Sequence, residues 1–502
     1  MRVAGLAGRI ASRWEGGQRR TCAVPTILIE LGCFEMVGTL RFAHLTVPFE
    51  LVTLMLHLRL LLAAAASLSL SSLAIAQPAP APVRPAPARP SVVPGQQPPA
   101  AAARSPRAAA CHNGMPFDRF LADLKQQAVA EGVSQRALAE AAPYLTYDQS
   151  IVNRDRGQRV FGQVFTEFAR NRASDGAAKN AQARIRMHAA AFNRAEKEYG
   201  VPSAVIAAFW GLESSFGAEL GKLHTLPSLV SLAYDCRRSE MFQKETIAAL
   251  KIIDRGDLSA SEMIGSWAGE LGQTQFLPTH YFNYAVDYDG DGHRNMLRSV
   301  PDVIGSTANY IANGLKWRRG EPWLQEVRAP ANFPWDQADL TIKLSRAKFA
   351  QLGVTYPDGR PLPNDDMPAS LLLPMGRTGP AFLAYANFAA YTEWNNSLIY
   401  STTAGYLASR IAGAPPMRQP SAPVAQLPVN ELKELQQLLV RAGFNVGKVD
   451  GVMGQLSRTA VKAMQVKYGL PADSWPTAEL LARMRGPGVQ AQPAGLVMPA
   501  AR

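Results

Sequence analysis

From about Phe117 onward, apolar residues recur at intervals of three and four, the spacing of one face of an α-helix. The pattern is clearest in three segments: 117–124, 160–173 and 181–199. Strand signals are scarce before about residue 325. Between 325 and 375, residues 340–344 alternate, and residues 369–374 form a short apolar run bounded by turns. We therefore predict a mainly α-helical main domain with a small β insertion.

One predicted helix carries a single acidic residue on its apolar face. Residues 201–217 read VPSAVIAAFWGLESSFG, in which Pro202 suits the first helical turn and the serines and glycine suit the end. Ile206, Phe209 and Glu213 share one face, so the carboxyl should be buried. Burial raises a carboxyl pKa, and a protonated glutamic acid is the general acid of glycoside cleavage. An exposed or salt-bridged Glu at a helix end is the alternative.

Length and charge narrow the possibilities. A chain of 502 residues predicts roughly two to four domains, and a hydrophobic content of 47% can form a sizeable core. The formal net charge of +12 suits an anionic partner, such as nucleic acid, a membrane surface or an acidic cell-wall polymer. Because the basic residues are dispersed and form no run typical of a nucleic-acid arm, we favour the polymer and expect no nucleic acid.

The N-terminal part has the pattern of an export signal. Residues 56–76 place Arg59 before an apolar run, which ends in an A-x-A cleavage site ahead of Gln77. We expect a signal peptide at 55–76, an exported protein of the periplasm and no transmembrane segment after cleavage. A retained anchor is the alternative. Residues 1–54 show no clear pattern, and we interpret them as the result of a start codon assigned too early, or as a genuine extension.

Segments rich in proline divide the rest of the chain. Residues 77–110 are rich in Pro and Ala and contain no acidic residue, as is typical of an extended linker. A second linker is predicted at 414–428. The main domain then spans 111–413, a compact helical unit spans 429–485, and a Pro/Gly/Ala-rich tail covers 486–502.

The four cysteines divide at the predicted cleavage site. Cys22 and Cys33 precede it, which leaves Cys111 and Cys236 in the mature chain. Two cysteines in an exported protein suggest one disulfide. Two free buried thiols are the alternative.

A second block of candidate chemistry lies at 265–284 (GSWAGELGQTQFLPTHYFNY). Its glycines permit close backbone approach, and its aromatic rings could stack on sugar rings. Its amide and hydroxyl groups could bind sugar hydroxyls, and they belong to Ser266, Gln273, Gln275 and Tyr281. A tightly packed helix–loop–helix would have a similar composition.

The segment 287–295 (DYDGDGHRN) has the pattern of a calcium loop, with oxygen donors at positions 1, 3, 5 and 9 and Gly at position 6. Position 12 is Arg298 in place of the usual Glu, and Asp302 could supply the closing carboxylate instead. We predict a structural calcium ion that is not required for the chemistry. An acidic glycine turn without metal is the alternative. The candidate ligands are Asp287, Asp289, Asp291, His293 through its backbone carbonyl, and Asp302.

Taken in order, these motifs resemble those of the B-type lytic murein transglycosylases, and the resemblance spans about residues 112–413. The segments that carry it are 209–217 (FWGLESSFG), 266–278 (SWAGELGQTQFLP), 287–295, 305–310 (GSTANY) and 394–400 (WNNSLIY). Separately, 429–485 resembles the small peptidoglycan-binding domain of three helices.

The resemblance implies a lysozyme-like helical catalytic domain that cleaves the MurNAc–GlcNAc bond of peptidoglycan glycan strands and leaves 1,6-anhydro-MurNAc ends. It places Glu213 on the family's single catalytic acid/base. It also implies substrate-binding residues, which are Ser266, Gln275, Tyr310, Asn395, Tyr400 and a basic pair, Arg237 and Arg238. The family's calcium site falls on Asp287, Asp289, Asp291, His293 and Asp302. Trp394 stands where the family has Tyr, and one extra residue lies between Asn295 and Asp302.

Because no paired carboxylate is evident beside Glu213, we expect it to act first as acid and then as base. The C6 hydroxyl of the substrate would attack C1, with no water consumed. A lysozyme-like muramidase that hydrolyses the same bond would need Glu219 or Glu270 to hold water. A non-catalytic peptidoglycan-binding protein is the alternative from another class. We expect a monomer.

Overall fold

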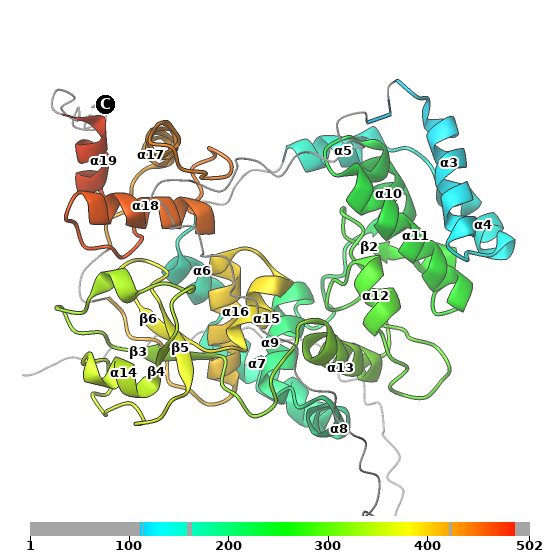
Figure 1. Ribbon diagram of the computed structural model, residues 1–502. Helices are drawn as coiled ribbons and strands as arrows, with labels where there is room; N and C mark the ends of the chain where they lie inside the picture. Colours follow the sequence, from blue (N-terminus) through cyan, green and yellow to red (C-terminus); the bar gives the residue numbers. More distant parts are fainter. Residues whose placement is uncertain (1–110, 113, 158–162, 421–423, 487–502) are drawn as a thin grey trace, which may run out of the picture. The chain divides into compact units, whose positions relative to one another are not determined.

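The computed structural model describes residues 111–112, 114–157, 163–420 and 424–486 (Figure 1). The predicted early extension (1–54), signal peptide (55–76) and first linker (77–110) lie outside the described residues, as does the tail after Gly486. Among the described residues, every helix is too short or too polar to span a membrane.

The first part of the main domain is helical, as predicted. The expected helix at 181–199 is wrong in one respect, because the chain breaks at His188 (φ −112°, ψ 33°) and forms two helices. The Ser134 side chain accepts a hydrogen bond from the backbone N–H of Ala137 and starts the second helix. The bounds are α3 Phe117–Ala130, α4 Gln135–Ala141, η1 Ala142–Tyr144, α5 Gln149–Arg156, α6 Phe165–Arg172, α7 Asp175–Met187 and α8 Ala189–Tyr199.

The next helices surround α9, whose Ile206, Phe209 and Trp210 are almost fully buried. A two-stranded antiparallel ribbon joins Leu223 to Gly265 and so brings the chain after α9 to the glycine-rich block. The bounds are α9 Ser203–Ser214, β1 Leu223–His224, α10 Thr225–Tyr234, α11 Ser239–Arg255, η2 Ala260–Glu262, β2 Ile264–Gly265, α12 Pro278–Tyr284, α13 Val300–Asn309 and the π-helical turn η3 Tyr310–Gly314.

The predicted β insertion is a four-stranded antiparallel sheet with the strand order β3-β6-β5-β4. Residues 340–344 do not form the expected strand, because the Asp339 carboxylate accepts hydrogen bonds from the N–H and hydroxyl of Thr341 and turns the chain. Only Leu344 pairs, opposite Ala369. The bounds are β3 Leu324–Val327, η4 Trp335–Gln337, β4 Leu344–Ser345, α14 Arg346–Gln351, β5 Pro368–Leu372 and β6 Ala381–Ala384.

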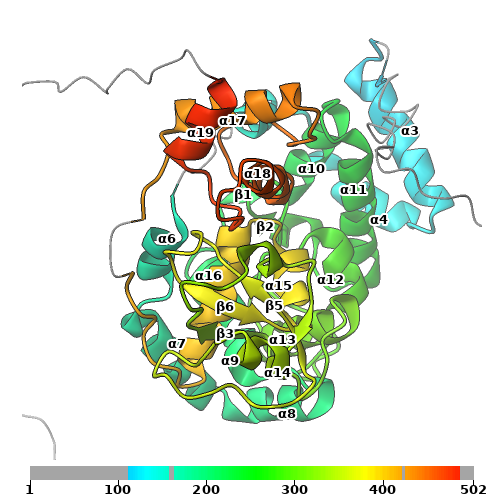
Figure 2. The ribbon, with the colours of Figure 1, turned by 60° about the vertical axis from the view of Figure 1, so that its left-hand side comes forward.

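After the sheet, the chain returns to α9. Helix α15 (Phe388–Trp394) leads into α16 (Leu398–Ile411), and α16 packs against α9 in both views (Figures 1 and 2). This packing brings residues near 400 close to residues near 210.

The C-terminal unit has the expected three helices, α17 Val429–Arg441, α18 Gln455–Lys467 and α19 Ala478–Arg485. Leu435, Leu439 and Val461 form its core with Leu480. The fully buried amide of Gln436 holds the loop between α17 and α18, because it accepts from the N–H of Gly451 and donates to the carbonyl of Val452.

A disulfide joins Cys111 to Cys236 across 125 positions of the chain. It connects the segment before α3 to the turn between α10 and α11, as expected for an exported protein. Closure of so long a loop limits the conformational freedom of the unfolded chain more than that of the folded one.

Candidate active site

Glu213 lies in the last turn of α9, where the chain reverses direction. Ser215 (φ 51°), Phe216 (φ 61°) and Gly217 (φ 86°) follow it with left-handed backbone conformations. Such conformations are costly for Ser and Phe and are stabilised by the surrounding structure. The reversal ends the helix one residue after Glu213, and the carboxyl of this half-buried residue then faces the start of α16.

Two side chains donate hydrogen bonds to one oxygen of Glu213. The indole Nε1 of Trp394, at the end of α15, lies 2.8 Å from Oε1, and the Tyr400 hydroxyl in the first turn of α16 donates to the same atom. The Trp394 ring stacks on Phe209, one helical turn before Glu213, with 4.0 Å between the ring centroids. Trp394, which stands where the family has Tyr in the WNNSLIY motif, therefore supplies both a stacking surface and a hydrogen-bond donor.

Burial, with a smaller contribution from the charge of Glu270, raises the pKa of Glu213 to about 7. The hydrogen bonds from Tyr400 and Trp394 act in the opposite direction, because they stabilise the carboxylate. Burial and the charge of Glu213 hold the pKa of Tyr400 well above its ordinary value, so Tyr400 stays a neutral donor. Near neutral pH, Glu213 can therefore both release and take up a proton.

Tyr310, which begins the π-helical turn, lies beside Trp394. Its ring stacks on His280 with 4.5 Å between centroids and lies 5.4 Å from the ring of Trp394. Burial lowers the pKa of His280, which favours the neutral imidazole beside the Tyr310 hydroxyl. Short π-helical turns occur often at functional sites, because they shift one side chain relative to the regular helix.

The polar residues of the glycine-rich block divide into two groups. Ser266 and Gln275 are partly exposed; the Ser266 hydroxyl donates to the Glu270 carboxylate, and the Gln275 amide donates to the Gly272 carbonyl at 2.9 Å. The interpretation of Gln273 and Tyr281 as sugar-binding groups is wrong, because both side chains are buried and bonded within the protein.

The structure gives the remaining predicted substrate-binding residues local partners. Arg237 and Arg238 both pair with the buried carboxylate of Asp155 on α5, Arg237 at 2.6 Å. The Asn395 side chain accepts a hydrogen bond from the backbone N–H of Ser397 at 2.9 Å, in the turn between α15 and α16. Among the described residues, none of these three side chains is hydrogen-bonded or ion-paired to Glu213, although Asn395 adjoins Trp394 in the chain.

The acidic loop brings together three of its predicted ligands. Carboxylate oxygens of Asp287, Asp289 and Asp302 lie within 4.8 Å of one another. Asp302 is fully buried and accepts from the backbone N–H of Tyr288 at 2.7 Å and of Asn295 at 2.6 Å. This set of hard oxygen donors fits a calcium ion. Asp302 lies on the next helix, α13, and its carboxylate accepts from backbone N–H groups of the loop, so it is the candidate for the closing ligand in place of a Glu at position 12.

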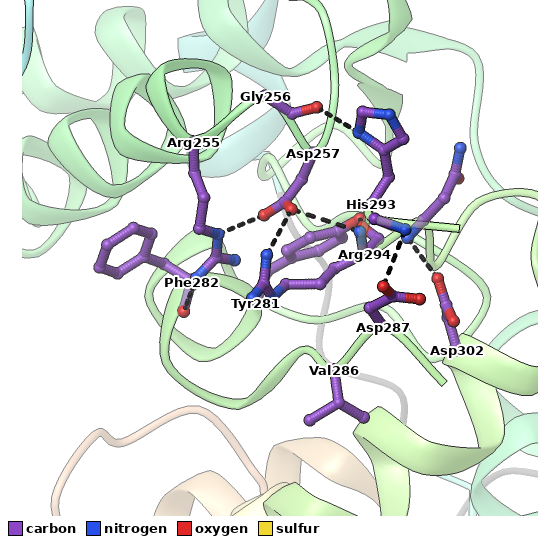
Figure 3. Close-up of polar contacts among 12 residues, drawn as sticks. Arg255, Gly256, Asp257, Tyr281, Phe282, Val286, Asp287, His293, Arg294 and Asp302 are labelled. Carbon is purple, nitrogen blue, oxygen red and sulfur yellow. Dashed lines mark hydrogen bonds and ion pairs between the residues drawn. The ribbon is translucent and has the colours of Figure 1, made fainter. Parts of the chain in front are cut away.

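The Asp291 carboxylate lies outside this group of three, and the backbone carbonyl of His293 as a ligand stays a prediction. The Asp291 carboxylate accepts from the His293 N–H at 2.8 Å, and Nδ1 of His293 lies 2.8 Å from the Gly256 carbonyl oxygen (Figure 3). Arg298, at position 12, pairs with Glu262 at 2.9 Å. The guanidinium group of Arg298 is therefore held by Glu262 of η2 and does not occupy the place of the closing ligand.

A buried carboxylate fixes the acidic loop to the end of α11. Asp257 pairs with Arg255 and with Arg294, the latter at 3.1 Å, and Arg255 also donates to the Phe282 carbonyl at 2.7 Å (Figure 3). The Tyr281 hydroxyl donates to the Arg294 carbonyl. The loop is thus joined to α11 and α12 independently of any ion.

Sequence reasoning missed two donors and one neighbouring charge. The replacement of the family's Tyr by Trp394 does not by itself indicate a donor, although the indole N–H can take the place of a tyrosine hydroxyl. Gln273 was grouped with the sugar-binding amides. The sequence presents Glu270 only as a rival base, whereas the structure bonds it to Ser266, four residues earlier in the SWAGELGQTQ segment.

Comparisons with known proteins find relatives for both folded parts of the chain. Residues 116–409 match the family described as transglycosylase SLT domain, and residues 428–484 match a peptidoglycan binding domain. Membrane-bound lytic murein transglycosylase B of Escherichia coli (strain K12) is 34% identical over 224 residues, which cover 44% of this chain and 60% of that protein.

Two solved structures are also similar. SltB3 from Pseudomonas aeruginosa, in complex with NAG-anhNAM-pentapeptide, has a TM-score of 0.68 and 38% identity, over 74% of this chain and 100% of that one. Escherichia coli Slt35 in complex with calcium has a TM-score of 0.50 and 27% identity, over 60% and 94%. The catalytic-domain match extends over more than half of the sequence, and the chain therefore belongs to the transglycosylase SLT domain family.

Proposed function

We propose that this protein is a lytic transglycosylase that cleaves the MurNAc–GlcNAc β-1,4 bond of peptidoglycan and forms 1,6-anhydro-MurNAc ends. The observation that carries the proposal is Glu213, a carboxyl with a pKa of about 7 at the end of a buried helix, bonded to Trp394 and Tyr400. Further support comes from the SltB3 structure, whose bound NAG-anhNAM-pentapeptide contains an anhydro sugar.

The proposed reaction uses Glu213 twice. The protonated carboxyl donates its proton to the glycosidic oxygen while the bond from C1 to that oxygen breaks. Trp394 and Tyr400 stabilise the carboxylate that results. The C6 hydroxyl of the same MurNAc residue then attacks C1 and returns its proton to Glu213. The two protons balance, no water is consumed, and the enzyme is ready for another cycle.

Hydrolysis would need a second carboxylate that holds a water molecule opposite Glu213. The Glu270 carboxylate accepts a hydrogen bond from Ser266, a predicted substrate-binding residue, and so already has a partner within the glycine-rich block. Glu219 is exposed. The internal C6 hydroxyl has the higher effective concentration, which favours ring closure over hydrolysis.

Product analysis tests the proposal. Purified peptidoglycan is digested with the wild-type protein, Glu213→Gln and the matched control Glu219→Gln, and the soluble products are identified by mass spectrometry. We expect anhydro ends from the wild type and from Glu219→Gln, and a loss of about 10²- to 10⁴-fold for Glu213→Gln. Reducing ends would contradict the transglycosylase proposal and favour a muramidase. Full activity of Glu213→Gln would contradict the role of Glu213.

Three further properties belong to the proposal. The signal pattern at 55–76, the disulfide and the cell-wall substrate support an exported protein of the periplasm. The C-terminal unit would hold the enzyme on the glycan, as its match to a peptidoglycan binding domain suggests. Asp287, Asp289 and Asp302 would bind a structural calcium ion, which is supported by their oxygen donors and by the calcium complex of Slt35. That ion would order the loop and would not take part in the bond cleavage.

A further inference from the structure

Gln273 is buried between the catalytic helix and the segment that follows the acidic loop. Its Oε1 accepts from Nε1 of Trp210 on α9 at 2.8 Å, and its Nε2 donates to the Leu297 carbonyl at 3.1 Å. Its backbone N–H donates to the Met296 carbonyl at 2.9 Å, and its backbone carbonyl accepts from the Ser214 hydroxyl. Each of its four kinds of polar group therefore has a partner.

On the side of α9, these contacts reach the residue next to Glu213. Ser214 is fully buried, and its hydroxyl oxygen also accepts from the Gly217 N–H at 2.8 Å. A Cβ atom at Gly217 would lie only 2.7 Å from Cδ of Gln273. The turn that ends α9 and fixes the direction of the Glu213 carboxyl is therefore closed directly against the Gln273 side chain.

On the other side, Gln273 reaches the end of the acidic loop. Met296 and Leu297 follow Asn295, whose backbone N–H donates to the Asp302 carboxylate at 2.6 Å. Met296 is fully buried, and its Cβ would come within 2.8 Å of a Cβ at Gly272. Gln273 is thus hydrogen-bonded to Met296 and Leu297, the two residues that follow Asn295. It is also hydrogen-bonded to Ser214, the residue that follows Glu213.

We propose that Gln273 is a positioning residue for Glu213: it couples the order of the 287–302 loop to the last turn of α9, so that the carboxyl stays at Trp394 and Tyr400. The proposal rests on the proposed role of Glu213 as acid and base. The groups that face the Glu213 carboxyl are Tyr400 from α16, Trp394 from α15 and Glu270 from the glycine-rich block. Among the described residues, Gln273 is hydrogen-bonded to none of these three and acts through Ser214 and Gly217.

The test uses Gln273→Met, which keeps the side-chain length and removes the amide. The matched control is Gln436→Met, which removes a buried amide with three comparable hydrogen bonds from the C-terminal unit. For Gln273→Met we expect kcat at pH 7 to fall about tenfold with little change in KM, because a misplaced acid affects the chemical step. The alkaline limb of kcat should move to lower pH, because burial is the largest cause of the raised pKa of Glu213 and its loss outweighs the loss of the hydrogen bonds from Trp394 and Tyr400, which acts in the opposite direction. The alkaline limb of Gln436→Met should match that of the wild type.

A second measurement does not depend on activity. Trp394 lies against Glu213, so the pH titration of tryptophan fluorescence, taken as the difference from Glu213→Gln, follows the ionisation of Glu213. The midpoint should fall in Gln273→Met and stay in place in Gln436→Met. If Gln273→Met does not fold, Ser214→Ala removes the hydroxyl between Gln273 and Gly217 and should move the midpoint in the same direction.

Wild-type values in both measurements for a folded Gln273→Met, or for Ser214→Ala where Gln273→Met does not fold, would overturn the positioning role. If instead the wild type forms no anhydro products while the fluorescence midpoint still moves in Gln273→Met, the proposed function fails and the coupling stands. The two failures are therefore distinguishable.

Discussion

The indole N–H of Trp394 and the hydroxyl of Tyr400 donate to the same oxygen, Oε1, of Glu213. Both hydrogen bonds fall on one oxygen, so Oε2 is the atom that we expect to carry the transferred proton. The two donors are separated from Glu213 by 181 and 187 positions in the chain. The packing of α15 and α16 against α9 therefore assembles the proton-transfer site.

The first prediction concerns Trp394→Phe, which keeps a ring against Phe209 and removes the donor. Hydrogen bonds to the carboxylate lower the pKa, so removal of one should raise the pKa of Glu213 and move the alkaline limb of kcat to higher pH. The rate below that limb should fall about tenfold, since the carboxylate formed in the reaction loses a charge-assisted bond. Trp394→Tyr offers a hydroxyl donor and is the conservative control. A limb that moves to lower pH in Trp394→Phe would contradict the assignment.

Glu270→Gln should shift the pKa of Glu213 in the direction opposite to that expected for Trp394→Phe. The charge of Glu270 raises the pKa of Glu213, so the neutral amide should move the alkaline limb to lower pH. The products should remain anhydro sugars, because Glu270 is not expected to hold a water nucleophile. The pH–rate profile and the mass of the products are measured on the same digest. Conversion to another product in this variant would mean that Glu270 takes part directly in the reaction.

Glu213→Gln should stabilise the fold at alkaline pH. The folded-state pKa of Glu213 is raised, so protonation contributes stability that is fully present below the unfolded value and is lost as the pH rises through about 7. The shift from 4.5 to about 7 corresponds to at most about 3 kcal/mol. Gln does not titrate, so the advantage of Glu213→Gln in thermal unfolding should be larger at pH 8 than at pH 5. An equal difference at both pH values would show that the carboxyl is not perturbed.

Removal of calcium should lower the melting temperature of the wild type. An ion present at about one hundred times its Kd stabilises a fold by about 2.7 kcal/mol. Asp302→Asn should abolish the change in Tm on addition of EDTA, because it removes the buried carboxylate that closes the loop. Asp291→Asn is the matched control, since Asp291 lies outside the group of three carboxylates, and it should retain the response to EDTA. If Asp302→Asn kept the change in Tm on addition of EDTA and Asp291→Asn lost it, the proposed set of ligands would be excluded.

Local patterns predicted the helical domain and the position of Glu213, because helical periodicity depends on neighbouring residues. The same patterns failed where a contact distant in sequence or a polar turn decides the structure. Periodicity continues through His188, although the helix breaks there, and Asp339 turns a segment whose alternation favours a strand. The roles of Trp394 and Gln273 depend on partners far along the chain, and a single sequence does not show which amide binds sugar and which binds the protein.

The contact between Gly217 and Gln273 also constrains the order in which the two positions can change. Any side chain at Gly217 meets the amide of Gln273 and must in addition adopt φ near 86°. If Gln273 were first replaced by a shorter residue, only the backbone constraint at Gly217 would remain. The effects of substitutions at these two positions should therefore depend on each other. Replacing Gln273 first and Gly217 second should damage the fold less than the opposite order.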